Sequence, residues 1–288
     1  MGLKGETPIG IFPFFYQKTF IIKGVFSPPP KTAVPYLGPL IVDYDTLKQD
    51  KKESIYIEFQ KEIDKLIFNE INPSYVSFSL PPGFIDARPF KWSGYKVTPN
   101  YNYVIDLSKG IDKIWMDFKK ELRGSITETE KKIHIIEGHR EELEFIYNSL
   151  FNRYNEQDIT IPLHKEYLLE LYDFFSDNFK IFIAKYNGEV ISGRIVVYYK
   201  NKAATWIGSA RPNLKGISPN DLVQWETIKW AHAQGFKYCE LMGAGTQRLI
   251  SYKSKCNPDI TVCFEVKKST LLGNIAEKGY NILKTRRL

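Results

Sequence analysis

A lysine at residue 253 follows a glycine-containing segment in the C-terminal third of the chain. Gly243-Ala244-Gly245 comes directly after a predicted strand over 236–242, and Tyr252 precedes Lys253. In open α/β sheets, ligands usually bind where strands feed into such loops. An ammonium group there can hold a phosphate or stabilise an oxyanion, and the glycines would let a ligand approach the backbone closely. The alternative interpretation of Lys253 is a solvated loop lysine without a function.

An arginine occupies a comparable position one predicted strand earlier. Ser209-Ala210-Arg211 closes a strand over 203–209 and precedes a helix over 219–233. Ser218 and Asp221 match an S-x-x-D capping box at the start of that helix. Because a helix N-terminus favours bound anions, Arg211 stands where a phosphate-binding arginine would be useful. An exposed loop arginine is the alternative.

Other common catalytic and cofactor motifs are missing or incomplete. The Gly243 segment opens a G-x-G-x-x sequence whose sixth residue is Arg248, so the dinucleotide-binding fingerprint fails. The chain contains no P-loop and no G-x-S-x-G. The 4 His residues have no partner at i,i+4 spacing, so we predict no metal site. Cys239 alternates within a predicted strand, which favours a buried thiol over a nucleophile. We expect no cofactor.

Positive charge is concentrated in the C-terminal part of the chain. Residues 1–179 carry 22 Lys and Arg against 26 Asp and Glu, a net charge of −4, whereas residues 180–288 carry 18 against 7, a net charge of +11. This asymmetry indicates a polyanionic partner or a phosphate-bearing substrate. A solvated basic face with a basic tail over 284–287 is the alternative.

The sequence predicts a cytoplasmic protein without a transmembrane segment. No apolar run approaches the ~20 residues that a membrane-spanning helix needs. The start, MGLKGETPIG, lacks the basic and apolar regions of a secretory signal. The 3 Cys form no CxxC, which is typical of reduced thiols.

The order of predicted elements favours an α/β (α+β) protein with two units. We place the first unit at 1–130 and the second at 131–288, each a mixed twisted sheet flanked by helices. The second unit contains a hairpin at Asn187-Gly188 and ends in a basic helix over 270–283. Further helices are predicted over 51–71, 108–126 (with Ser108 as its cap), 141–154 and 165–175, and further strands over 75–80, 101–107, 133–137, 179–185, 190–199 and 260–266.

Several short motifs, taken in their order along the chain, resemble the Fem-like family. This family comprises the peptidoglycan interpeptide-bridge aminoacyltransferases and belongs to the GNAT-like acyltransferase superfamily. The resemblance covers most of the chain, from Pro8 to Val266. The motifs are Ser27-Pro28-Pro29, Tyr36-Leu37-Gly38, Trp92 with Gly94-Tyr95, Tyr103 to Leu107, Arg123 with Ile126, Trp206-x-Gly208-Ser209-Ala210, Trp225-Glu226, Trp230-Ala231, Gly235, Gly243 and Lys253.

This resemblance implies tandem GNAT-like units that transfer an acyl group to an amine. The typical donor is an aminoacyl-tRNA, and the typical acceptor is a cell-wall precursor carrying a nucleotide or lipid diphosphate. Lys253 is then the catalytic residue, beside the aminoacyl ester or its terminal phosphate, and Arg211 lies near the acceptor cleft. The substrate-binding residues would further include Trp206, Ser209, Gly243, Gly245 and Tyr252. Relatives usually have a further stretch before the counterpart of Pro8, which leaves open whether the first unit lacks its opening strand and helix.

Two alternative functions stay open on the sequence. One is an acyl-CoA-type N-acyltransferase that acts on a sugar amine or polysaccharide precursor. A coenzyme A site needs a Gly-rich loop before the main helix, but here that loop reads ARPNLKGISPND with one glycine, which argues against this donor. The other alternative is a non-catalytic module that binds RNA or a nucleotide-sugar.

Overall fold

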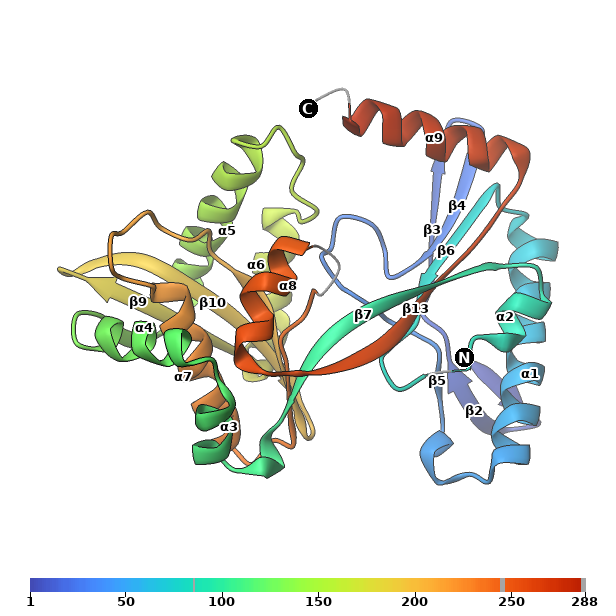
Figure 1. Cartoon of the computed structure of the whole chain (residues 1–288). Helices are drawn as coiled ribbons and strands as arrows, with labels where there is room; N and C mark the ends of the chain where they lie inside the picture. The colour runs from blue at the N-terminus through green and yellow to red at the C-terminus, as the bar shows by residue number, and fades with distance from the viewer. Residues whose placement is uncertain (85, 244–246, 286–288) are drawn as a thin grey trace. The chain divides into compact units, whose positions relative to one another are not determined.

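The chain forms two compact units (Figure 1). The computed structural model describes residues 1–84, 86–243 and 247–285. One unit comprises Met1–Asn100 together with Val262–Leu288, and the other comprises Tyr101–Thr261; we call them unit 1 and unit 2. Their bounds differ from the division into 1–130 and 131–288. The physical reason is strand exchange: the C-terminal part of β7 (Lys96–Asp106) pairs in unit 2, and β13 (Asp259–Ser269) returns to pair in unit 1.

Unit 2 is built on a mixed sheet with strand order β7-β12-β11-β10-β9-β8. Strands β11 and β12 are parallel and are connected through helix α7, whereas all other neighbours in this sheet are antiparallel. A parallel pair needs such a crossover because a tight turn can join only antiparallel strands. The bounds are β8 His134–Gly138, β9 Phe179–Tyr186, β10 Glu189–Tyr199, β11 Lys202–Gly208, α7 Pro219–Ala233 and β12 Tyr238–Glu240.

The hairpin predicted at Asn187-Gly188 is confirmed. The two residues connect β9 and β10 with φ of 51° and 86° respectively. A type I′ turn needs positive φ at both central positions, and Asn and Gly tolerate this region best. The same strand β10 carries Gly193, where an added Cβ would lie 2.8 Å from side-chain atoms of Ile146 and Ile183. Gly193 therefore lets helix α5 pack directly on the sheet.

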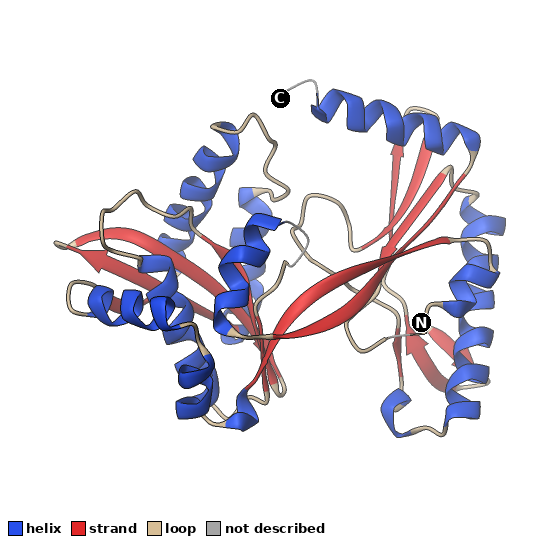
Figure 2. Ribbon diagram, in the orientation of Figure 1, coloured by secondary structure: helices blue, strands red, loops and turns tan. Residues whose placement is uncertain are grey.

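Helices cover both faces of the sheet of unit 2 (Figure 2). Helices α3, α4 and α7 share one hydrophobic core with the strands, and α5 packs on the other face, where it also contacts α6. The predicted helix over 108–126 is wrong in two respects. It breaks at Phe118 into α3 and α4, and Ser108 does not cap it: Ser108 lies in a 3₁₀ turn that Asp106 caps, accepting from the Ser108 N–H at 3.0 Å, and α3 begins after Gly110. The bounds are α3 Ile111–Asp117, α4 Lys120–Glu130, α5 Arg140–Asn155 and α6 Lys165–Phe175, with 3₁₀ turns at Leu107–Lys109 and Ser176–Asn178.

Aromatic rings join α3 and α7 in the core of unit 2. The ring centroid of Trp225 on α7 lies 4.7 Å from that of Trp115 and 5.3 Å from that of Phe118. Trp225 is only 8% exposed, so these contacts are largely withdrawn from water. Aromatic pairs at this spacing stabilise a core beyond the area that they bury.

Unit 1 repeats the connectivity of unit 2. Its main sheet has the order β3-β4-β6-β13, in which β4 and β6 are parallel and helix α1 lies between them in the chain. In both units, a hairpin is followed by a crossover helix, a parallel strand and an antiparallel neighbour. The bounds are β3 Phe15–Thr19, β4 Ile22–Ser27, α1 Gln49–Lys65 continued by a π-helical turn Leu66–Ile71, β6 Tyr75–Ser79, α2 Arg88–Trp92 and α9 Leu271–Thr285, with a small sheet of β1 Gly2–Lys4, β2 Thr7–Ile11 and β5 Leu40–Ile41 and a 3₁₀ turn Tyr44–Thr46.

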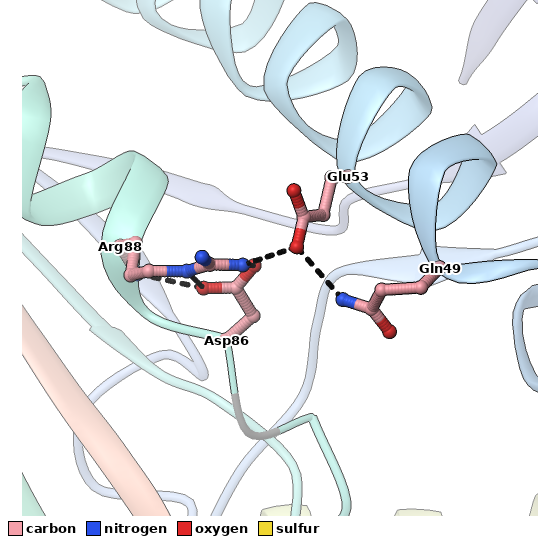
Figure 3. A network of polar contacts seen from close by, with 4 residues as sticks. All are labelled: Gln49, Glu53, Asp86 and Arg88. Atoms are coloured by element: carbon pink, nitrogen blue, oxygen red, sulfur yellow. Dashed lines mark hydrogen bonds and ion pairs between the residues drawn. The ribbon is translucent and has the colours of Figure 1, made fainter.

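A polar network ties the start of α1 to the segment before α2 (Figure 3). The guanidinium of Arg88 donates to Glu53 at 2.7 Å and to both carboxylate oxygens of Asp86, at 2.8 and 2.9 Å. Gln49 also donates to Glu53 at 2.9 Å. These donors lower the pKa of the Glu53 carboxyl, with the Gln49 bond as the largest cause.

Within the described ranges, no helix is both long enough and apolar enough to cross a bilayer.

Candidate functional site

Lys253 ends a short helix that the sequence did not predict. Helix α8 (Gln247–Lys253) occupies part of what we expected to be a loop between two strands, followed by a 3₁₀ turn over Ser254–Cys256. Isolated helices of this length are unstable in water, so tertiary contacts must hold it. The contacts of Tyr252 and Lys253, described below, supply them.

The Lys253 ammonium is anchored at the C-terminal end of β12. Its Nζ donates to the main-chain carbonyl of Leu241 at 2.6 Å, to that of Met242, and at 3.5 Å to that of Gly243. These three residues continue the chain directly from the last strand residue, Glu240. The amine is therefore fixed at the sheet edge where open α/β sheets bind ligands.

Burial changes the acidity of this lysine. Desolvation, followed by the positive charge of Arg194, lowers the pKa of Lys253 to about 7. The three carbonyl acceptors favour the ammonium form, but the loss of solvation is the larger effect. Lys253 consequently changes its charge close to neutral pH, where a group can switch between holding an anion and releasing a proton.

Arg194 in strand β10 is the buried cation that adds to the effect of desolvation on Lys253. Its side chain is 8% exposed, and its Nη1 donates to the side-chain oxygen of Gln224 on α7. Among the residues with described side chains, none accepts a hydrogen bond from its Nε. Arg194 also lies near Tyr252: burial raises the pKa of the Tyr252 hydroxyl, and the charge of Arg194 opposes this rise. The positive charge of Arg194 acts on the buried carboxyl of Asp221 as well as on Lys253, so it contributes to the electrostatics of the whole site.

We expect Arg194→Met to raise the pKa of Lys253, because the substitution removes a positive charge that disfavours the ammonium. Titration of the isotope-labelled lysine signal by NMR measures the change, and Arg194→Lys should leave the pKa close to 7. An unchanged pKa in the Met variant would show that burial alone causes the shift.

Tyr252 connects Lys253 to the end of β11. The Tyr252 hydroxyl donates to the main-chain oxygen of Asn220 at 3.2 Å, and the Asn220 amide donates to the main-chain oxygen of Ser209 at 3.1 Å. The Ser209 hydroxyl in turn accepts from the Gly193 N–H at 3.0 Å and lies 3.2 Å from the hydroxyl of Ser192. A continuous polar network thus joins the ends of β11 and β12 through the first turn of α7.

Arg211 lies at the N-terminus of α7. Its guanidinium donates to the hydroxyl of Ser218 at 3.0 Å. Ser218 holds the N-cap position but its hydroxyl makes no capping bond, so the predicted capping box with Asp221 is wrong. Asp221 is instead buried, and desolvation raises the pKa of its carboxyl against the opposing charges of Arg211 and Lys255. The Ser218 hydroxyl is thus oriented toward Arg211 and not toward the first turn of α7.

The remaining predicted residues fall in different places. Gly243 has a φ of 60° and lies next to the Lys253 amine, consistent with the backbone freedom that glycine provides. Gly245 lies outside the described residues. Trp206 packs against Phe179, with 6.1 Å between ring centroids, and Phe179 also contacts Tyr172 of α6. Cys239 is fully buried, and burial raises the pKa of its thiol to about 12, as its alternation in a strand predicted.

Our sequence analysis missed Arg194, Asn220 and Gln224 as members of this site. Arg194 left a signal, because it is a charged residue within the apolar run ISGRIVV. Asn220 and Gln224 left none, since polar residues are expected on any exposed helix face. Only the packing of α7 on β10 shows that Gln224, at 3% exposure, is directed to the interior.

Comparison with known proteins identifies the class. Residues 116–254 match the family described as an acetyltransferase (GNAT) domain, a range that lies within unit 2. No curated protein sequence matches the chain. The chain therefore carries a GNAT domain and is an acyltransferase of GNAT type, as the resemblance in its sequence predicted.

Solved structures extend the likeness over both units. FemX aligns with a TM-score of 0.65 at 13% identity, covering 92% of this chain and 86% of that one. L-PGS from Bacillus licheniformis aligns with a TM-score of 0.55 at 15% identity, covering 95% and 86%. A tandem GNAT protein from the clavulanic acid biosynthesis pathway gives 0.53 at 8% identity, covering 92% and 80%. The predicted α/β fold of tandem GNAT-like units is confirmed, and the likeness to a Fem-type protein holds at the level of the fold.

Proposed function

We propose that this acyltransferase moves an aminoacyl group from aminoacyl-tRNA to an amine of a cell-wall, nucleotide-linked or lipid-linked precursor. The observation that carries the proposal is the Lys253 ammonium, fixed at the end of β12 within the GNAT domain. The Fem-like motifs of the sequence and the fold shared with FemX support an aminoacyl donor. The net charge of +11 over residues 180–288 suits a polyanionic donor and a diphosphate-bearing acceptor.

In the proposed reaction, the acceptor amine attacks the ester carbonyl carbon of the aminoacyl-tRNA directly. A C–N bond forms, the ester C–O bond breaks, the amine gives up a proton, and the tRNA hydroxyl oxygen takes one. Lys253 would stabilise the tetrahedral oxyanion by turning one N–H from a main-chain carbonyl toward it. Arg211, exposed at the start of α7, would hold an acceptor phosphate, with Ser209, Tyr252, Gly243, Gly245 and Trp206 completing the substrate-binding surface.

The decisive experiment offers purified protein a pool of tRNA charged with labelled amino acids. Pools of nucleotide-linked and lipid-linked wall precursors serve as acceptors. We expect label to move from tRNA to the amine of one precursor class, in an amide bond that resists mild base. Charged tRNA that loses label only to water, with either acceptor pool, would contradict the proposal.

An acyl-CoA donor is the second candidate, because residues 116–254 match an acetyltransferase family. In the loop before α7, Ile217 and Ser218 are buried and Gly216 is the single glycine, which leaves few free amides for a pyrophosphate. We therefore expect coenzyme A not to raise the melting temperature. A specific ligand at a hundredfold excess over its Kd would stabilise the protein by about 2.7 kcal/mol, a shift of several degrees. Such a shift would favour the acyl-CoA function on a sugar amine.

A non-catalytic module for RNA or nucleotide-sugars is the third candidate. It predicts that the wild-type protein binds tRNA but transfers no label above background. Lys253→Ala would then change no transfer rate. Binding without turnover in the labelled transfer assay would support it.

A further inference from the structure

Helix α9 of unit 1 contacts its own sheet through its polar face. Glu277 accepts a hydrogen bond from the Tyr75 hydroxyl at 2.9 Å and pairs with Lys267 at 3.4 Å. At Gly273, a Cβ would collide with the main-chain oxygen of Ser74, so glycine is needed for this close approach. Gly273 and Glu277 lie four residues apart and therefore share one face of the helix.

The opposite face of α9 is apolar and exposed. Leu271, Leu272 and Ile275 are 83%, 40% and 67% exposed. An amphipathic helix normally buries such side chains against its own domain, so this orientation is inverted. The sequence continues the apolar spacing at Ile282 and Leu283.

The turn between β3 and β4 presents two more apolar side chains. Phe20 and Ile21 form its tip and are 91% and 72% exposed. Phe20 has a φ of 53°, a conformation that is rare for a bulky residue, whereas Asn and Gly are the usual choices in hairpin turns. Neither folding nor turn geometry accounts for an apolar pair at this position.

Ser74 brings the turn and the helix together within unit 1. Its main-chain N–H donates to the oxygen of Lys23, two residues after Ile21, at 2.8 Å. Its main-chain oxygen accepts from the Thr270 N–H, directly before α9, at 3.0 Å. Figure 1 shows α9 crossing the end of unit 1 at which β3 turns into β4. The turn tip and α9 thus lie at the same end of unit 1. We call their exposed apolar side chains, Phe20, Ile21, Leu271, Leu272 and Ile275, the end patch.

Two exposed lysines flank the end patch. Lys18 lies two residues before the turn tip, and Lys278 shares the outward side of α9 with Leu271 and Ile275; both lysines are exposed. The acidic residue of the described part of α9, Glu277, is turned inward and paired. By sequence, Lys284, Arg286 and Arg287 follow at the C-terminus. Exposed apolar side chains flanked by basic ones are the pattern of a surface that lies in a membrane interface and favours anionic headgroups.

We propose that the end patch docks unit 1 onto an anionic lipid bilayer, with Phe20, Ile21, Leu271 and Ile275 entering the headgroup region and Lys18 and Lys278 contacting lipid phosphates. This docking does not depend on the proposed reaction, because it requires no substrate. The helix lies in the interface and does not span it.

Vesicle sedimentation tests the proposal with the full-length protein. Vesicles of phosphatidylglycerol and phosphatidylcholine should bind the protein, vesicles of phosphatidylcholine alone should bind it much more weakly, and high salt should release it.

Each of the double variants Phe20→Asn/Ile21→Ser and Leu271→Ser/Ile275→Ser should reduce binding about tenfold or more. Lys18→Gln/Lys278→Gln should reduce it by about fivefold for each lysine. Phe174→Ser, at a phenylalanine of α6 that is 80% exposed, should have no effect.

Folding and self-association are measured on the same variants. The substituted side chains are exposed, so circular dichroism and melting temperature should match wild type in every variant. Failure of the wild-type protein to bind anionic vesicles would overturn the proposal, as would equal losses in the Phe174 control. If the apolar variants instead abolish a concentration-dependent dimer seen by light scattering, the patch is an interface between two copies of this chain and the lipid proposal is wrong.

Discussion

Replacing Lys253 by methionine should lower kcat for aminoacyl transfer by about a hundredfold to a thousandfold, the range seen when one oxyanion donor is removed. Methionine keeps the length of the side chain but cannot donate to an oxyanion or to the carbonyls of Leu241 and Met242. Substrate affinity should change less, because the proposed contact forms mainly in the transition state. Initial rates over a range of donor concentrations separate the two constants.

The pH dependence gives an independent readout of the same residue. With a pKa of about 7, the Lys253 ammonium is lost as pH rises through neutrality, so kcat/KM should fall on the alkaline side of pH 7. Lys253→Arg should remove this alkaline limb, because a guanidinium stays charged. In the unfolded chain this lysine has its ordinary pKa of 10.5. Between pH 7 and 10.5 the unfolded chain therefore binds more protons than the folded protein, so the free energy of unfolding should rise with pH in this range.

Lys237 provides the control for Lys253. It is exposed, it directly precedes β12 at the end of that strand opposite Lys253, and its main-chain N–H and oxygen bond to Asn201 and Leu107, which a side-chain change preserves. Lys237→Met should therefore retain most activity. Equal losses in the two methionine variants would indicate a general effect of basic charge, and a fully active Lys253→Met would exclude this lysine from the chemistry.

Trp225→Ala should destabilise unit 2 by about 3–5 kcal/mol, the range for removing a large aromatic side chain from a core. The substitution deletes the ring between Trp115 and Phe118 and leaves a cavity between α3 and α7. Because α7 also carries Asn220 and Gln224, the site should loosen with the core. Urea unfolding followed by fluorescence and circular dichroism measures the loss.

Phe174→Ala is the control for this cavity. Phe174 is also aromatic and lies in unit 2, but at 80% exposure its removal should change stability by no more than about 0.5 kcal/mol. A Trp225→Ala protein as stable as this control would mean that the core collapses around the missing ring or that α7 contributes little to the cooperative unit.

Much of the architecture followed from local patterns. Pro219 to Ala233 was predicted with the bounds that α7 has, and Asn187-Gly188 marked the β9–β10 hairpin, because apolar period and turn chemistry act over a few residues. The ranges of β11, α6 and α9 were predicted to within two residues for the same reason. The GNAT class was visible in the order of short motifs.

Long-range contacts decided the parts that the sequence left undetermined. The C-terminal part of β7 pairs with β12 in unit 2, and β13 pairs with β6 in unit 1. These pairings join residues that are far apart in the chain, so local sequence patterns do not predict them. The hydroxyl of Ser218 makes no capping bond and accepts instead from Arg211, seven residues away. The short helix α8 forms because Tyr252 and Lys253 bond to α7 and to the end of β12.

The sequence by itself determined that Lys253 is a cation placed after a strand of an α/β sheet. Tertiary structure alone decided that this amine is partly withdrawn from water, held by three main-chain carbonyls and near Arg194, since desolvation depends on what packs around a group and not on its neighbours in the chain. The same holds for the end patch: the apolar spacing of α9 is written in the sequence, but the contact of Gly273 and Glu277 with the sheet is what turns that apolar face outward.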